Sequence, residues 1–217
     1  MAHLIHLWHE RNGWSHRVLP LLSEVLDLGK VHNSQISNLR NGKLSSPGPE
    51  VFLALAQVNT ILDQGIEKIR DRFESDYPEL WKSLEESALP LKNDSGNPLS
   101  AGELFEIFSG LKSLPSSFDW YIEDEEASAL SDALSEHFCQ NKAWRLCKIQ
   151  VMEAYAVNKS ARRERFAEVI AGIRDYTAEE LDGELLDLYE ASKKLSYFQG
   201  RGPNAFLAEL RNLASEK

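Results

Sequence analysis

The chain lacks the sequence motifs of several common chemistries. It has no glycine-rich phosphate loop, no HExxH or CxxC pair and no nucleophile elbow, so we expect no enzyme, no metal site and no cofactor. It has only two cysteines, Cys139 and Cys147, which we expect to be reduced thiols of a cytoplasmic protein. No apolar run approaches the roughly 18 residues of a membrane span. The N-terminus also lacks the basic start and long apolar core of a secretory signal.

Basic residues are outnumbered, with 24 Lys and Arg against 34 Asp and Glu and a net charge of −10. This imbalance is unevenly distributed. Residues 1–72 contain eight basic and seven acidic residues, a net charge of +1, so the remainder carries −11. Five of the six histidines lie within the first 32 residues. The split indicates a near-neutral N-terminal module joined to an acidic body.

Strand-like alternation is missing, and almost the whole chain shows helical periodicity, so we expect an all-α fold. The expected helices cover residues 3–11, 15–28, 34–41, 49–72, 101–112, 124–140, 142–158, 161–174, 178–196 and 204–215. The helix that starts at Pro49 either continues to residue 72 or ends near Asn59. Pro20 should make its helix start late or kink, because proline removes a donor and clashes with the preceding turn.

Short polar residues mark several of the expected helix ends. The N-cap candidates are Ser15, Asn33 or Ser34, and the capping-box pairs Ser100–Glu103 and Thr177–Glu180. Gly42 is well placed to end the helix over 34–41. The segment LKNDSGNP (91–98) has the composition of a linker. We therefore expect an N-terminal helical domain over 1–72, a connecting region over 73–99 and a helical acidic domain over 100–217.

The first 60 residues carry three motifs that resemble one known family. RNGWSH (11–16) resembles the family's R-x-G-apolar-Ser/Thr-Gln step between its first two helices. ISNLRNGK (36–43) is similar to its I-S-x-apolar-E-x-G-K, and Pro47, Phe52, Leu55 and Ala56 fit its P-x4-L-x2-L-A ending. Residues 3–59 thus resemble the Cro and phage-repressor (XRE) type of helix-turn-helix domain. The 21 positions from Ser15 to Ile36 exceed the compact family spacing, so the second helix, or its turn into the third, should be longer.

The polar helix over 34–41 suits a DNA groove on physical grounds. Ile36 and Leu39 would hold it on the domain, and the opposite face carries short or amide side chains and no acid. Asn and Gln can pair with adenine through two hydrogen bonds. The candidates for base contacts are Asn33, Ser34, Gln35, Ser37 and Asn38.

The resemblance also implies phosphate contacts, which would set the position of the protein on the duplex. By this carry-over the phosphate contacts are Ser15, His16, Asn41 and Lys43, together with Arg40, which replaces the acidic residue usual at its position and adds a positive charge. Lys30 is a weaker candidate.

Three other groups of residues have two readings each. His3, His6 and His9, with Glu10, could bind a metal, but surface or packing histidines are the simpler interpretation. The basic segment NKSARRERF (158–166) could contact phosphate, although a solvated helix face is the simpler reading. The segment SFDWYIEDEEA (117–127) could be an exposed docking segment, although its aromatic residues suit a core.

The function that these expectations favour is a sequence-specific transcriptional regulator that binds double-stranded DNA as a homodimer. Its acidic domain (100–217) would supply dimerisation, effector sensing or contact with a protein partner, and no membrane would be involved. The alternative is a non-catalytic interaction module that uses the helix-turn-helix fold for docking. The weak positive charge of residues 1–72 favours this alternative, since many DNA-binding domains are clearly basic.

Overall fold

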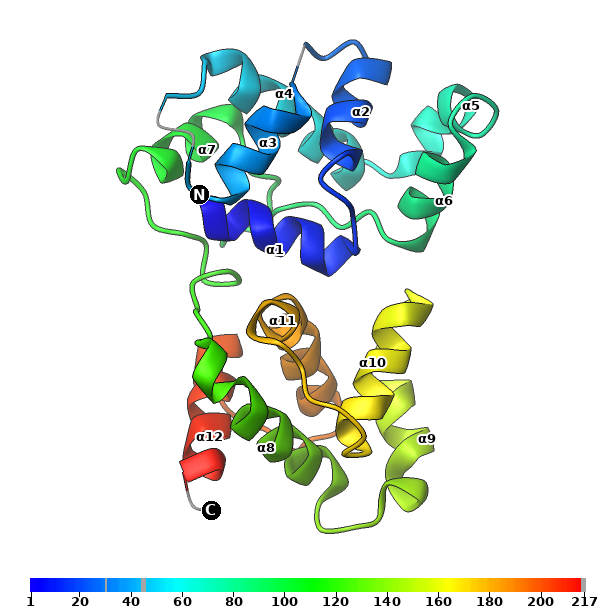
Figure 1. Cartoon of the computed structure of the whole chain (residues 1–217), viewed down its shortest axis with the longest axis vertical. Coiled ribbons are helices and arrows are strands. Elements are labelled where there is room, and N and C mark those ends of the chain that lie inside the picture. The colour runs from blue at the N-terminus through cyan, green and yellow to red at the C-terminus, as the bar shows by residue number, and fades with distance from the viewer. Residues whose placement is uncertain (30, 44–45, 216–217) are drawn as a thin grey trace. The chain divides into compact units, whose positions relative to one another are not determined.

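The computed structural model of the chain describes residues 1–29, 31–43 and 46–215. Within these residues the fold is all-α, with twelve α-helices and no strand, as expected (Figure 1). The chain divides into two compact units, Met1–Phe118 (unit 1) and Asp119–Lys217 (unit 2). No helix in the described part is both long and apolar enough to cross a membrane.

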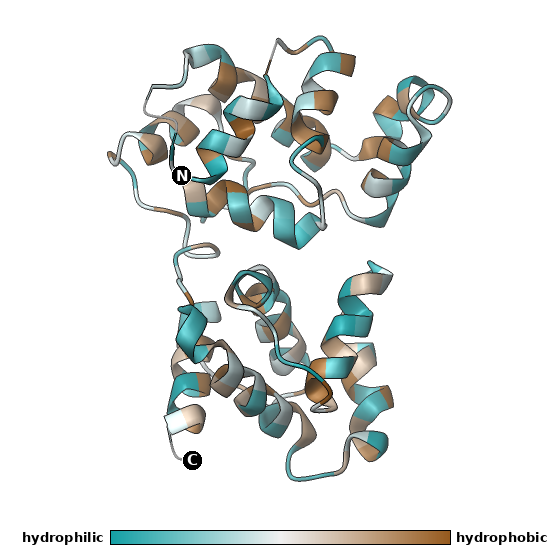
Figure 2. Cartoon of the chain, viewed as in Figure 1, coloured by the Kyte–Doolittle hydropathy of each residue, from teal (hydrophilic) through white to brown (hydrophobic). Residues whose placement is uncertain are grey.

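Unit 1 contains seven α-helices and one short 3-10 helix. They are α1 (Ala2–Asn12), α2 (Val18–Val25), α3 (Asn33–Arg40), α4 (Pro49–Asp63), η1 (Ile66–Ile69), α5 (Arg70–Phe73), α6 (Pro78–Glu86) and α7 (Ala101–Phe108). Helix α3 packs against α1 and α2, while α4 packs against α2 and α7. The longer helices of unit 1 each bury apolar residues, and Figure 2 shows these apolar residues alternating with polar ones along the ribbons.

Unit 2 contains five α-helices and one short 3-10 helix. They are η2 (Asp124–Glu126), α8 (Ala127–Cys139), α9 (Trp144–Ala154), α10 (Ser160–Ile170), α11 (Ala178–Lys194) and α12 (Pro203–Ser215). Helix α8 contacts each of the other four helices and packs most extensively against α10 and α12. The core of unit 2 contains many aromatic residues, and among them the Tyr155 and Phe166 rings stack with centroids 4.1 Å apart.

The predicted helix ends are confirmed where a local motif sets them. Ser100 and Thr177 cap α7 and α11, and each completes its capping box. Gly13 ends α1 in the left-handed conformation, with φ 58°. Helix α2 begins late, at Val18, so that Pro20 lies in the first turn, where the missing N–H would have had no helical partner.

Two predicted caps are wrong. Ser15 does not cap α2, because the helix begins three residues later and Arg17 is its N-cap. Neither Asn33 nor Ser34 caps α3, since both are helical and His32 is the N-cap. There the Gln35 Oε1 accepts a hydrogen bond from the His32 N–H at 2.8 Å, which is the reaching-back half of a capping box.

Residues 73–99, expected to connect two domains, lie within unit 1. Two buried asparagines hold this segment. Asn12 of α1 accepts from the Leu89 N–H at 2.6 Å and donates to the Leu89 carbonyl at 3.1 Å. Asn59 of α4 likewise accepts a hydrogen bond from the Leu91 N–H at 2.6 Å and donates one to the Leu91 carbonyl at 2.8 Å. The segment therefore forms part of the wall of unit 1.

Candidate nucleic-acid interface

Helix α3 is held on unit 1 by its apolar side, as its sequence predicts. Ile36 is fully buried and Leu39 is 2% exposed. They lie three residues apart and therefore face the same side of the helix. The polar residues of α3 are thereby turned away from the core.

The base-contact candidates lie on or beside this outward side. Asn33, Ser34 and Asn38 are exposed, whereas Gln35 and Ser37 are half-buried. The Gln35 oxygen already accepts one hydrogen bond, from the His32 N–H, which ties this amide to the start of α3. Three of the five candidate side chains are therefore fully accessible to solvent, and two are partly covered.

The carboxyl end of α3 presents two of the phosphate candidates. Asn41 and Lys43 are both exposed. Gly42 adopts a left-handed φ of 65°, and the Lys43 N–H then reaches back to the Asn38 carbonyl at 2.8 Å. This turn is a helix end of the kind predicted for Gly42, and it fixes the direction in which the chain carries Lys43.

Arg40 is placed differently from the other candidates. Its Nε donates to His6 Nδ1 at 3.0 Å, and its Nη2 lies 3.2 Å from Glu10 Oε1. Both charged side chains are 25% exposed. Arg40 therefore anchors α3 to α1, and the carboxylate of Glu10 offsets the charge that a phosphate would need.

Ser15 and His16 are exposed in the turn that precedes α2. The Ser15 carbonyl accepts from the Val18 N–H at 3.1 Å, so the two residues stand just outside the helix. Lys30, the weaker candidate, lies outside the described residues. Residues 28–49 contain no Asp or Glu, so α3 and its flanking turns form an acid-free stretch between Asp27 and Glu50.

The histidines of α1 have separate roles. His6 accepts from Arg40, whereas His9 is fully buried with its Nδ1 2.7 Å from the Ile5 carbonyl. Burial lowers the pKa of His9 to about 4, so it is neutral at physiological pH. The geometry therefore favours a packing role for His9 over metal binding.

Sequence reasoning missed a buried ionic cluster in unit 2. The predicted solvated face over 158–166 is wrong at Arg162, which is 2% exposed and forms a bidentate pair with Glu184 at 2.8 and 2.5 Å. Tyr155 also donates to Glu184. Arg163 bonds three carbonyls at the end of α9, those of Met152, Tyr155 and Val157. No local signal marked these contacts, because Glu184 lies 22 residues away.

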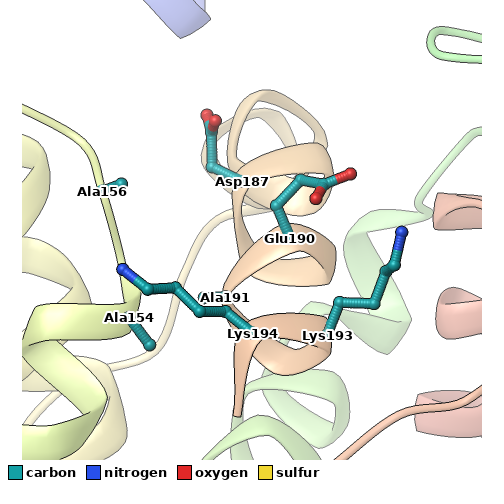
Figure 3. Close-up of a pocket in the computed structure, with 7 residues that line it drawn as sticks. All are labelled: Ala154, Ala156, Asp187, Glu190, Ala191, Lys193 and Lys194. Carbon is teal, nitrogen blue, oxygen red and sulfur yellow. The ribbon is translucent and has the colours of Figure 1, made fainter. Parts of the chain in front are cut away.

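Unit 2 also has an open hollow of about 440 Å³ between the end of α9 and α11 (Figure 3). Ala154, Ala156 and Ala191 line it, beside the side chains of two acids and two lysines. Asp187 already pairs with Arg162 at 2.7 Å, and Lys194 donates to the Glu153 carbonyl at 3.0 Å. Lys193 Nζ lies 5.4 Å from the centroid of the Tyr189 ring. Three of the four charged groups are thus engaged within unit 2, and the hollow does not define a ligand class.

Comparison with known proteins found one family model that matches within each unit. The model of a family described as "Domain of unknown function (DUF8644)" matches residues 1–110, just over half of the chain. The chain belongs to this DUF8644 family. A second model, "Domain of unknown function (DUF8645)", matches residues 127–217. No curated protein and no solved structure matches the chain. The DUF8644 and DUF8645 matches leave residues 111–126 between them, and the boundary between the two units falls in this gap.

Proposed function

We propose that the chain is a sequence-specific DNA-binding transcriptional regulator that acts as a dimer. In this proposal residues 3–59 form a Cro/repressor-type helix-turn-helix domain, in which α3 is the recognition helix. The observation that carries the proposal is the outward side of α3. It combines exposed Asn33, Ser34 and Asn38 with a buried Ile36–Leu39 anchor, in a stretch without acids.

The chemistry of this side suits base edges and phosphates at once. An amide such as Asn38 can donate to and accept from adenine, worth about 1–3 kcal/mol of discrimination per good pair. Lys43, at the end of the same helix, would contact a phosphate together with Asn41, Ser15 and His16. Because Arg40 is paired with Glu10, we leave it out of the phosphate set.

Two variants test the assignment in full-length protein. Asn38→Ala should relax base preference at one position of the site, with a modest loss of affinity. Lys43→Ala should weaken binding to all sequences alike and reduce the slope of log K against log salt by about 1. Lys68→Ala, which removes a cation outside the α3 region, is the matched control. If affinity, preference and salt slope are unchanged in Asn38→Ala and Lys43→Ala, α3 is not the recognition helix.

A protein-docking module is the second candidate, and the charge of unit 1 favours it. Residues 1–118 contain eleven basic and fifteen acidic residues, a net charge of −4. A negative domain repels phosphate at long range. Salt distinguishes the two functions, because phosphate-mediated binding weakens steeply as salt rises whereas apolar docking does not.

A further inference from the structure

Helix α9 has a partly apolar side that the described residues of unit 2 leave exposed. It packs on the unit through Cys147, Val151 and Ala154, all buried. Leu146 and Ile149 are 71% and 77% exposed. At 100° per residue, Ile149 lies opposite the midpoint of the three buried positions. Figure 2 shows the resulting mixture of apolar and polar residues along the α9 ribbon.

The charges on this exposed side are arranged against the dipole of the helix. Lys142 and Arg145 are exposed at the amino end, Lys148 is exposed next to Ile149 near the middle of the helix, and Glu153 is exposed near the carboxyl end. The first turn has no acid and the last turn no base. Cations at the positive end of a helix dipole and an acid at its negative end are each unfavourable. Within the described chain, none of these four side chains has an ion-pair partner that would offset this cost.

We propose that this side of α9 is a contact surface for a second copy of the chain, with the two α9 helices antiparallel across a two-fold axis. In this arrangement the cationic end of each helix lies over Glu153 of the other copy. Each positive helix end also lies beside a negative one, which removes the opposition between charge and dipole. Leu146 and Ile149 of the two copies cover each other in the centre.

The same geometry excludes a parallel pair, which would bring the three cations of one copy against the three of the other. A two-fold arrangement uses the same patch on both copies and therefore closes at two. Helix α9 is about 16 Å long, so the contact is smaller than the roughly 1,200 Å² of a standard stable interface. We therefore expect a weak dimer that forms at micromolar concentrations.

The surface lies in unit 2 and does not depend on α3. The proposal rests on the proposed function, because it names the contact that would join two copies of a DNA-binding chain. The association of the two copies is measured without DNA. Failure of either claim is therefore visible separately. A dimer that selects no DNA sequence contradicts the DNA binding of the proposed function and leaves this surface standing. A monomer that selects a sequence contradicts this surface and the dimeric form of the regulator, and leaves DNA binding by α3 standing.

Sedimentation velocity of the full chain, from about 1 μM to about 500 μM, tests the dimer directly over the range of a weak association. The mass should rise with concentration from that of one copy to that of two. Ile149→Glu should raise the dissociation constant roughly tenfold or more, since it places two carboxylates at the centre. Leu111→Glu, at a residue of unit 1 that is also 77% exposed, is the control and should change nothing.

Charge reversal tests the antiparallel order. Glu153→Arg should weaken the dimer, and adding Arg145→Glu should restore much of the loss, because the order of charges is then reversed in both copies. Circular dichroism should show an unchanged helical content, since all three positions are exposed. The proposal is overturned by a monomer at every concentration, by a dimer that is indifferent to Ile149→Glu, or by a reversed pair that is no better than Glu153→Arg alone.

Discussion

Replacing Asn59 by alanine should lower the free energy of unfolding of unit 1 by about 3 kcal/mol. The side chain is fully buried on α4 and makes three hydrogen bonds to another segment. Its Oδ1 accepts from the Leu91 N–H at 2.6 Å, and its Nδ2 donates to the carbonyls of Leu91 and Leu99 at 2.8 and 3.3 Å. At about 1 kcal/mol for each bond, the sum is about 3 kcal/mol. The orphaned Leu91 N–H alone would cost about 1–3 kcal/mol, which agrees with that figure.

The measurement is urea unfolding combined with hydrogen exchange read by mass spectrometry, which resolves peptides from unit 1 and unit 2. Peptides over 87–99 should lose protection first in Asn59→Ala, because the asparagine ties this segment to α4. Asn38→Ala is the matched control, since Asn38 is exposed and its loss should change stability by about 0.5 kcal/mol or less. A loss below about 1 kcal/mol for Asn59→Ala, with normal protection over 87–99, would refute the reasoning.

Three predictions concern unit 2. Burial lowers the pKa of His137 to about 4. The stability that its neutral form contributes is therefore present above its unfolded pKa near 6.5 and is lost as the pH falls toward 4. In urea titrations at pH 7 and pH 4.5, His137→Gln should reduce the difference in the free energy of unfolding between the two pH values by up to about 3 kcal/mol. Burial raises the pKa of Asp182 to about 7, so the stability that its protonated form contributes is present below about pH 4 and is lost as the pH rises through 7. Asp182→Asn should therefore stabilise unit 2 at pH 8 and make the loss of stability on acidification steeper. An unchanged profile of stability against pH would contradict the shift. Glu184→Gln should destabilise unit 2 by about 3–5 kcal/mol, because it leaves Arg162 buried without its main counter-charge. Asp187→Asn changes the 23% exposed partner of Arg162 and should cost about 1 kcal/mol or less. Equal shifts of the melting temperature in the two variants would argue against the buried pair.

Much of the fold could be predicted because the deciding interactions are local. The capping box of Ser100 involves a residue three positions away, and Pro20 affects only its own turn. The burial of Ile36 and Leu39 follows from their helical spacing. These features depend on neighbouring residues, so a pattern within ten residues contains them.

The remaining features depend on partners that are distant in the sequence. Asn59 bonds a residue 32 positions away, so a segment with the composition of a linker became part of unit 1. Arg40 is a plausible phosphate ligand until Glu10, 30 positions earlier, is brought beside it. Arg162 has the sequence context of a solvated helix, and only the approach of α11 buries it. In each case an ordinary polar residue acquired its role through tertiary contact.

Selection from a randomised duplex library, with full-length protein at low and at physiological salt, tests the central claim most directly. We expect a recovered motif with two-fold symmetry, with half-sites about one helical turn, roughly 10–10.5 base pairs, apart. We also expect Asn38→Ala to relax one position in each half-site. If no sequence is enriched, and the only binding is weak and disappears as salt rises, the chain is not a sequence-specific regulator and the docking-module function takes its place.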